Sequence, residues 1–257
     1  MPHSAPVGVF DSGYGGISVL RSVRAMLPHE SYLYFGDNAN APYGVRPGEE
    51  IRRLSLAAGQ RLADQGVKAI VVACNTATGI ALSALRAAFP MPVIGIQPAL
   101  EAAQRLRRDG KVLALATPAT FQTDTYAALY ARHGQHTISL PCPGLMEFVE
   151  REELTGSRLH AFLERLFAPY LNEPIDAVVL GCTHYPFLKD EIAGFFPDAV
   201  LVDASTDTAQ QLKSALAERS LLAPPGREGT VTFLSSAGPE AAEKMRRFYN
   251  LITDSHT

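Results

Sequence analysis

The sequence predicts an α/β protein made of two pseudo-symmetric α/β domains with mainly parallel sheets. Short apolar runs rich in Val, Ile, Leu and Phe alternate along the 257 residues with segments of helical periodicity. One of these runs, ending in Cys74, is repeated in a later run that ends in Cys182. The alternation predicts parallel sheets, and the repeat predicts that the architecture is duplicated.

The predicted strands are the short apolar runs bounded by turn residues. In chain order they span residues 7–10, 32–35, 67–73, 93–96, 112–116, 137–140, 175–181, 200–202 and 231–234. Between them, apolar residues recur at helical spacing in 54–62 and in 159–166. We expect these helical stripes to be packing faces with no part in chemistry.

The repeat pairs residues 66–74 with residues 174–182 without a gap. Its flanks also correspond, residues 7–11 with 113–117 and residues 92–96 with 199–203. Chance similarity between buried Val/Ile/Leu strands is the alternative explanation. The strand near Phe233 and the helix near Met245 have no counterpart in the second half.

A duplicated architecture with an unmatched tail predicts one discontinuous domain. The first domain is expected to comprise residues 1–97 plus 208–257, and the second residues 98–207. The C-terminal segment would then return to complete the first domain.

Composition excludes several classes of protein. The chain is 47% hydrophobic and 19% charged with a net charge of −3, values typical of a globular protein. The densest basic cluster, residues 105–111, fits a solvated helix end, so nucleic acid is not an expected partner. The start of the chain lacks a secretory pattern and no apolar run reaches membrane-span length, which favours a cytoplasmic protein.

The three cysteines require separate interpretations, because they form no Cys-x-x-Cys pair and suit neither a disulfide framework nor a structural zinc site. Cys142 lies between two prolines and is expected to be a small core residue. Cys74 and Cys182 lie where an apolar strand meets a polar loop, and N–H groups of a following helix can stabilise a thiolate there. If the two halves face each other, these sulfurs flank one cleft from opposite sides, which suits inversion at a carbon centre.

Other polar residues also follow predicted strands, at the edge where parallel sheets bind ligands. They are Asp11, Ser12, Asn75, Thr76, Thr117, Thr183 and His184. Each taken alone is also an ordinary helix N-cap, and His184 an ordinary capping histidine.

Three alternative sites are compatible with parts of the sequence. Gly13-x-Gly15-Gly16 with Asp37 loosely matches a dinucleotide fingerprint, but Ser18 replaces the third glycine. Cys74, Cys182 and His184 are enough ligands for a catalytic zinc, although no fourth ligand is evident. A Cys/His hydrolase would leave the second cysteine without a role.

The motifs together resemble those of glutamate racemases, in the aspartate/glutamate racemase family. The matching blocks are GVFDSG at 8–13, YFGD at 34–37, APYG at 41–44, VVACNTAT at 71–78, PVIG at 92–95 and LGCTHYP at 180–186. The resemblance spans roughly residues 7–238, and the two cysteine blocks are its most specific parts. Departures include Asn40, where arginine is frequent, and Met146-Glu147, where an apolar residue and proline are usual.

This resemblance implies a cofactor-independent enzyme that interconverts L- and D-glutamate in a cleft between its two domains, usually as a homodimer. Cys74 and Cys182 would be the paired acid and base, assisted by Asp11 and His184, with Glu150 as a further charged neighbour. The implied substrate contacts are Asp11, Ser12, Tyr43, Gly44, Asn75, Thr76, Thr183 and His184, and less firmly Thr117 and Thr120. No metal or cofactor is implied, and the product would supply peptidoglycan synthesis.

Two alternatives in function stay open at this point. Aspartate differs from glutamate by one methylene, which a sequence pattern hardly reports, so an aspartate racemase is the nearest alternative. A binding protein on a racemase scaffold is the other, although a pure binder has no need of opposed thiols.

Overall fold

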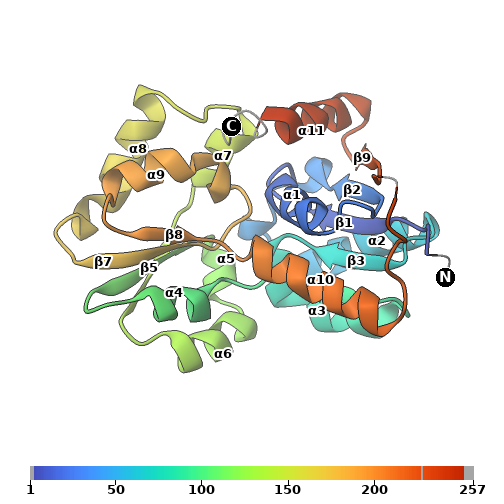
Figure 1. The fold of residues 1–257 in the computed structure, drawn as a ribbon. Helices are drawn as coiled ribbons and strands as arrows, with labels where there is room; N and C mark the ends of the chain where they lie inside the picture. Colours follow the sequence, from blue (N-terminus) through green and yellow to red (C-terminus); the bar gives the residue numbers. More distant parts are fainter. Residues whose placement is uncertain (1–2, 227, 252–257) are drawn as a thin grey trace. The chain divides into compact units, whose positions relative to one another are not determined.

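The structure is a computed structural model that describes residues 3–226 and 228–251. The described residues divide into two compact units, 3–97 with 205–226 and 228–251, and 98–204. The second boundary lies at 205 and not at 208 because helix α10 (Ser205–Glu218) belongs as a whole to the first unit. Each unit contains one parallel sheet, so the expected α/β architecture with two mainly parallel sheets is confirmed (Figure 1).

The first unit is built on a five-stranded sheet of order β4-β3-β1-β2-β9, with every pairing parallel. The strands are β1 (Val7–Asp11), β2 (Tyr32–Gly36), β3 (Ala69–Val72), β4 (Val93–Gly95) and β9 (Val231–Ser235). Every residue of β1 to β4 is buried, as expected for strands covered on both faces. The unmatched strand β9 pairs with β2 and thus joins this sheet.

Helices cover both faces of this sheet. They are α1 (Ile17–Met26), α2 (Gly48–Asp64), α3 (Asn75–Ala88), α10 and α11 (Pro239–Leu251), with short 3-10 turns η1 (Asn38–Asn40) and η2 (Tyr43–Val45). Helices α2 and α3 pack together over one face, while α1 packs against α10 and α11. The stripe Leu54, Ala58 and Leu62 on α2 is buried in the core, which confirms its packing role.

The second unit repeats four of the five strands of the first, all except β9. Its sheet has the order β6-β5-β7-β8, with β5 (Lys111–Ala116), β6 (Thr137–Pro141), β7 (Ile175–Leu180) and β8 (Val200–Val202). The order β4-β3-β1-β2 of the first sheet therefore corresponds to β8-β7-β5-β6 of the second. This correspondence matches the aligned segments of the sequence, in which β3 and β7 each lead to a cysteine.

The helices of the second unit are shorter on average. They are α4 (Leu100–Leu106), α5 (Pro118–Phe121), α6 (Asp124–His133), α7 (Leu145–Glu150), α8 (Ser157–Phe167) and α9 (Lys189–Phe195), with 3-10 turns η3 (Ala168–Tyr170) and η4 (Tyr185–Leu188). In Figure 1, α4 and α6 lie on one side of this sheet and α8 and α9 on the other. Across the described ranges of both units, no helix has the length and apolar character of a membrane span.

Candidate active site

Cys74 occupies the N-cap position of α3, directly after β3. Its sulfur accepts a hydrogen bond from the Ala77 N–H at 3.5 Å and donates to Ser12 Oγ at 3.8 Å. The side chain is 6% exposed. Because the N-terminal end of the 14-residue helix α3 carries partial positive charge, negative charge on this sulfur is favoured.

Asp11 is the last residue of β1 and is fully buried. Its Oδ1 accepts the Gly13 N–H at 2.8 Å. A Cβ on Gly16 would lie 2.5 Å from the Asp11 Cβ and 2.9 Å from the Tyr34 hydroxyl oxygen. The glycines that loosely resembled a dinucleotide fingerprint therefore let the start of α1 approach the carboxylate closely.

Tyr43 is held in place by a buried carboxylate that sequence reasoning did not place in the site. Its hydroxyl donates to Asp37 Oδ2 at 2.6 Å, and the Asn40 amide donates to both Asp37 oxygens. Burial, followed by the hydrogen bond and charge of Asp37, raises the pKa of Tyr43 far above its usual range, so the hydroxyl stays a donor. The sequence motifs contain Asp37 only as part of the loose dinucleotide fingerprint and of the YFGD block, although it directly follows β2 much as Asp11 ends β1.

Asn75, Thr76 and Gly44 are further predicted contact residues of this unit, and all three are buried. Asn75 is 6% exposed, and its buried side-chain oxygen accepts no hydrogen bond from the part of the chain that the structure describes. A buried acceptor without a donor costs free energy, on the order of 1–3 kcal/mol, unless a ligand or water supplies one. Asn75 is thus suited to receive a donor group of a ligand.

Cys182 lies two residues after β7, in the position that corresponds to Cys74. Its sulfur is 3.6 Å from His184 Nδ1, and the His184 Nε2 is 2.7 Å from Glu150 Oε1. Cys182 and His184 are 7% and 2% exposed. A Cβ on the preceding Gly181 would lie 2.6 Å from the Leu115 carbonyl oxygen, so only glycine allows this close approach to β5.

The electrostatics of His184 follow from these two contacts. Burial alone would lower its pKa, but the hydrogen bonds and charges of Cys182 and Glu150 outweigh burial and raise the pKa well above its usual value. The imidazole is therefore held protonated between a sulfur and a carboxylate. Thr183, Thr117 and Thr120 are also buried, with the hydroxyl oxygens of Thr117 and Thr120 2.9 Å apart.

Cys142 has a different environment, as its Pro-Cys-Pro sequence predicted. It is 2% exposed, and its thiol donates to the Leu140 carbonyl at 3.2 Å. Burial, with a smaller effect from Cys182, raises the pKa of Cys142 to about 12. This thiol stays neutral, as a core residue should.

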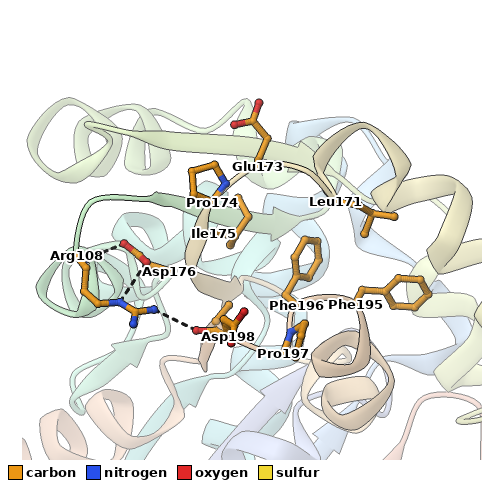
Figure 2. Close-up of a pocket in the computed structure, with 11 residues that line it drawn as sticks. Arg108, Leu171, Glu173, Pro174, Ile175, Asp176, Phe195, Phe196, Pro197 and Asp198 are labelled. Atoms are coloured by element: carbon orange, nitrogen blue, oxygen red, sulfur yellow. Dashed lines mark hydrogen bonds and ion pairs between the residues drawn. The ribbon is translucent and has the colours of Figure 1, made fainter.

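A separate hollow of about 440 Å³ lies at the opposite end of β7 (Figure 2). The Arg108 guanidinium pairs there with Asp176, with 3.3 Å between Nε and Oδ1, and the Arg108 backbone N–H donates to Asp176 Oδ2 at 2.7 Å. Phe195 and Pro174 line the wall of the hollow. It contains none of the predicted site residues. In the basic cluster at 105–111, Arg105, Arg108 and Lys111 pair with Glu101, Asp176 and Glu173, in keeping with a solvated helix end.

The residues that the structure describes include no group of three or more His, Cys, Asp or Glu side chains arranged to hold a metal ion. All three cysteines are free thiols. The polar residues instead form two sets at the carboxyl ends of equivalent strands, one around Cys74 and one around Cys182.

Comparison with known proteins decides the family. The model of the Asp/Glu/Hydantoin racemase family matches residues 17–212. The chain belongs to this family of racemases. It is 45% identical over 246 residues to the glutamate racemase of Pseudomonas paraeruginosa, covering 94% of this chain and 92% of that protein.

Solved structures of racemases share the fold. The glutamate racemase of Francisella tularensis in complex with D-glutamate has a TM-score of 0.82 at 31% identity, covering 96% of this chain and 94% of that one. The Escherichia coli glutamate racemase in complex with L-glutamate and the activator UDP-MurNAc-Ala has a TM-score of 0.84 at 32% identity, covering 95% of both chains. The architecture of two α/β units is therefore that of the family's glutamate racemases.

Proposed function

We propose that this racemase is a cofactor-independent glutamate racemase that interconverts L- and D-glutamate with Cys74 and Cys182 as acid and base. One observation carries the proposal: both cysteines follow equivalent strands, β3 and β7, and each has its own buried polar partners. Relatives at this level of identity that bear the name glutamate racemase support the choice of substrate. A lone buried cysteine would need no such duplicated setting.

The reaction needs one thiolate and one thiol on opposite faces of the α-carbon. The thiolate takes the α-proton, the electron pair stays with the substrate, and the thiol delivers its proton to the other face. Each sulfur must approach the α-carbon to about 3–3.5 Å. After one turnover the two cysteines have exchanged protonation states, ready for the reverse direction.

The polar partners assist these transfers differently. Asp11, beside the glycines that begin α1, is proposed to assist Cys74, which already donates to Ser12. His184 is proposed to assist Cys182 at 3.6 Å, with Glu150 holding the imidazole on its other side. A protonated imidazole favours the thiolate form of its neighbour.

Stabilising the carbanion is the main energetic task, because no pyridoxal phosphate is proposed to delocalise the charge. As enediolate-like charge develops on the substrate carboxylate, nearby hydrogen-bond donors stabilise it. We assign this to backbone N–H groups after Ser12, Asn75 and Thr183 and to the hydroxyls of Ser12, Thr76 and Thr183, which are all buried. The side-chain oxygen of Asn75 is available to accept a hydrogen bond from the substrate ammonium group.

Tyr43 and Gly44 are proposed to contact the rest of the substrate. Both are buried, and Asp37 fixes the direction of the Tyr43 side chain. The fit of glutamate against the shorter aspartate would depend on this loop, since one methylene in a pocket changes binding by only about 1–3 kcal/mol. The same proposal includes a cytoplasmic homodimer whose D-glutamate serves peptidoglycan synthesis.

The test is chiral analysis of L-glutamate incubated with purified protein that has been dialysed exhaustively against a chelator, with no pyridoxal phosphate added. We expect D-glutamate to accumulate until both enantiomers are equal. L-aspartate in a parallel reaction is the control for substrate choice. Activity that returns only with zinc or pyridoxal phosphate would refute the mechanism, and faster racemisation of aspartate would refute the substrate.

A further inference from the structure

Tyr185 connects the loop of Cys182 to the start of helix α7. Its side chain is fully buried, and its hydroxyl donates to the Cys142 carbonyl oxygen at 3.4 Å. The same carbonyl accepts the N–H of Leu145, the first residue of α7, at 3.3 Å. The hydroxyl therefore binds the same carbonyl group that accepts the first N–H of α7.

The other end of α7 returns to the same loop. Helix α7 ends at Glu150, whose carboxylate lies 2.7 Å from His184 Nε2. Since His184 and Tyr185 are neighbours in sequence, one short loop holds both ends of the helix. These contacts close a ring that passes from Tyr185 through Cys142, α7 and Glu150 to His184.

Helix α7 depends on such anchors because it is short. It has six residues, and its N-cap Gly144, at φ +89°, supplies no side-chain hydrogen bond. Helices of this length are unstable alone and take their position from tertiary contacts. A small shift of α7 would move the Glu150 carboxylate away from the imidazole.

We propose that the Tyr185 hydroxyl is a positioning group that holds α7 against the Cys182 loop and thereby keeps Glu150 on His184. This inference rests on the proposed function, in which His184 assists Cys182. Tyr185 touches no reacting atom in this assignment. It acts through Glu150.

The hydroxyl is suited to this task because its environment keeps it protonated. Burial, with the nearby Cys142, Cys182 and Glu147, raises the pKa of Tyr185 well above its usual value. The phenol therefore remains a donor to the carbonyl of Cys142. A tyrosine that only filled space would need its ring and not its hydroxyl. A buried hydroxyl requires a hydrogen-bond partner even when it has no function, so the role of this one is tested by removing it.

The experiment compares Tyr185→Phe with Tyr126→Phe. Each removes one hydroxyl from the second unit, but the Tyr126 hydroxyl bonds Ser139 and has no link to α7. For Tyr185→Phe we expect kcat to fall roughly 3- to 10-fold in both directions, with KM nearly unchanged. A decrease of this size corresponds to the free energy of one hydrogen bond. Tyr126→Phe should keep the wild-type kcat.

Two readouts separate positioning from packing. In a Glu150→Gln background, Tyr185→Phe should cause no further loss, because its effect passes through Glu150. NMR titration of His184 should give a lower pKa in Tyr185→Phe than in the wild type, and a lower one again in Glu150→Gln. The NMR measurement holds whether or not glutamate is the substrate, so it separates failure of this inference from failure of the proposed function.

Several results would overturn the proposal. They are an unchanged His184 titration in Tyr185→Phe, a wild-type kcat, or a full extra loss in the Glu150→Gln background. Failure of Tyr185→Phe to fold would also overturn it, because a hydroxyl that the whole fold requires has a wider role than the one assigned.

Discussion

At the scale of single residues, the two strand-terminal cysteines have unequal neighbours. Cys74 contacts a hydroxyl and the N-terminus of α3, whereas Cys182 contacts an imidazole that is itself paired with Glu150. A two-base enzyme accommodates this inequality, because each cysteine is the base in one direction of the reaction and the acid in the other. A single-base enzyme would carry the same proton from one face to the other.

Isotope incorporation tests this distinction. In D2O, product formed from either enantiomer during initial turnover should carry deuterium at Cα, while recovered substrate stays largely protiated. Mass spectrometry of separated enantiomers makes the measurement. Cys74→Ala and Cys182→Ala should each lower racemisation by several orders of magnitude. Product that keeps the original protium would contradict the paired-thiol mechanism.

Cys142→Ala provides the contrast, since its neutral thiol donates to the Leu140 carbonyl and also contacts the Tyr185 hydroxyl. We expect most racemase activity to remain. Loss of the buried sulfur should lower the free energy of unfolding by about 1–2 kcal/mol through packing. Activity and urea denaturation would be measured together. A loss of rate as large as that of Cys74→Ala would show that the cysteines were assigned wrongly.

The pair of His184 and Glu150 should make stability depend on pH. The folded state raises the His184 pKa above the unfolded value of about 6.5, so the pair's stabilisation is complete below that pH and is lost as pH rises through the raised pKa. Glu150→Gln should therefore lower the Tm most near pH 6 and progressively less at alkaline pH. Glu153→Gln, which breaks ion pairs with arginines, is the control and should show no such trend. An equal loss of Tm at all pH values would contradict the assignment.

At the scale of elements, the strands were predictable and the contacts between loops were not. Buried parallel strands appear as continuous apolar runs, and all the predicted runs became strands, with ends shifted by at most a few residues, as in β3. Parallel sheets bind ligands at the carboxyl ends of their strands, and this rule alone placed Asp11, Cys74 and Cys182 at the ligand-binding edges of the two sheets. Tyr185 and Cys142 are 43 positions apart, and their contact depends on how η4 meets α7, which no local pattern encodes.

One buried ion pair joins elements that are distant in sequence. Lys68, just before β3, is fully buried, and its Nζ contacts Glu30 Oε2 at 2.5 Å and the carbonyls of His3 and Leu221 at 2.6 and 2.8 Å. Glu30 Oε1 also accepts the Ala223 N–H at 2.7 Å. This pair fixes the segment between α10 and β9 to the start of the sheet.

Lys68→Met should therefore destabilise the protein strongly. Leaving Glu30 buried and unpaired should cost roughly 3–5 kcal/mol in urea denaturation, and Lys68→Met with Glu30→Leu should recover part of this loss. Lys111→Met is the matched control, because the pair of Lys111 and Glu173 is well exposed and should contribute at most about 1 kcal/mol. Equal effects of the two single substitutions would contradict the assigned role of Lys68.

At the scale of the whole molecule, we propose that the second unit is an independently folding domain inserted into the first. Residues 98–204 contain a complete four-stranded sheet with helices on both sides, whereas residues 1–97 lack β9, which pairs with β2, and α10, which packs on α1. Removing those partners exposes the edge of β2 and one face of α1. A domain of about 100 residues with its own core is of a size that folds alone.

Expression of the separate parts tests this proposal. Residues 98–204 alone should give a cooperative thermal transition by circular dichroism and dispersed NMR signals, and residues 1–97 alone should give neither. A chain joining residues 1–97 to 205–257 through a short Gly/Ser linker should fold, because α10 contacts β4 and the two ends to be joined therefore lie near each other. Neither folded part should racemise glutamate, since each contains one of the two required cysteines. An unfolded 98–204 fragment would contradict the domain division, and racemase activity in either part would contradict the need for both thiols.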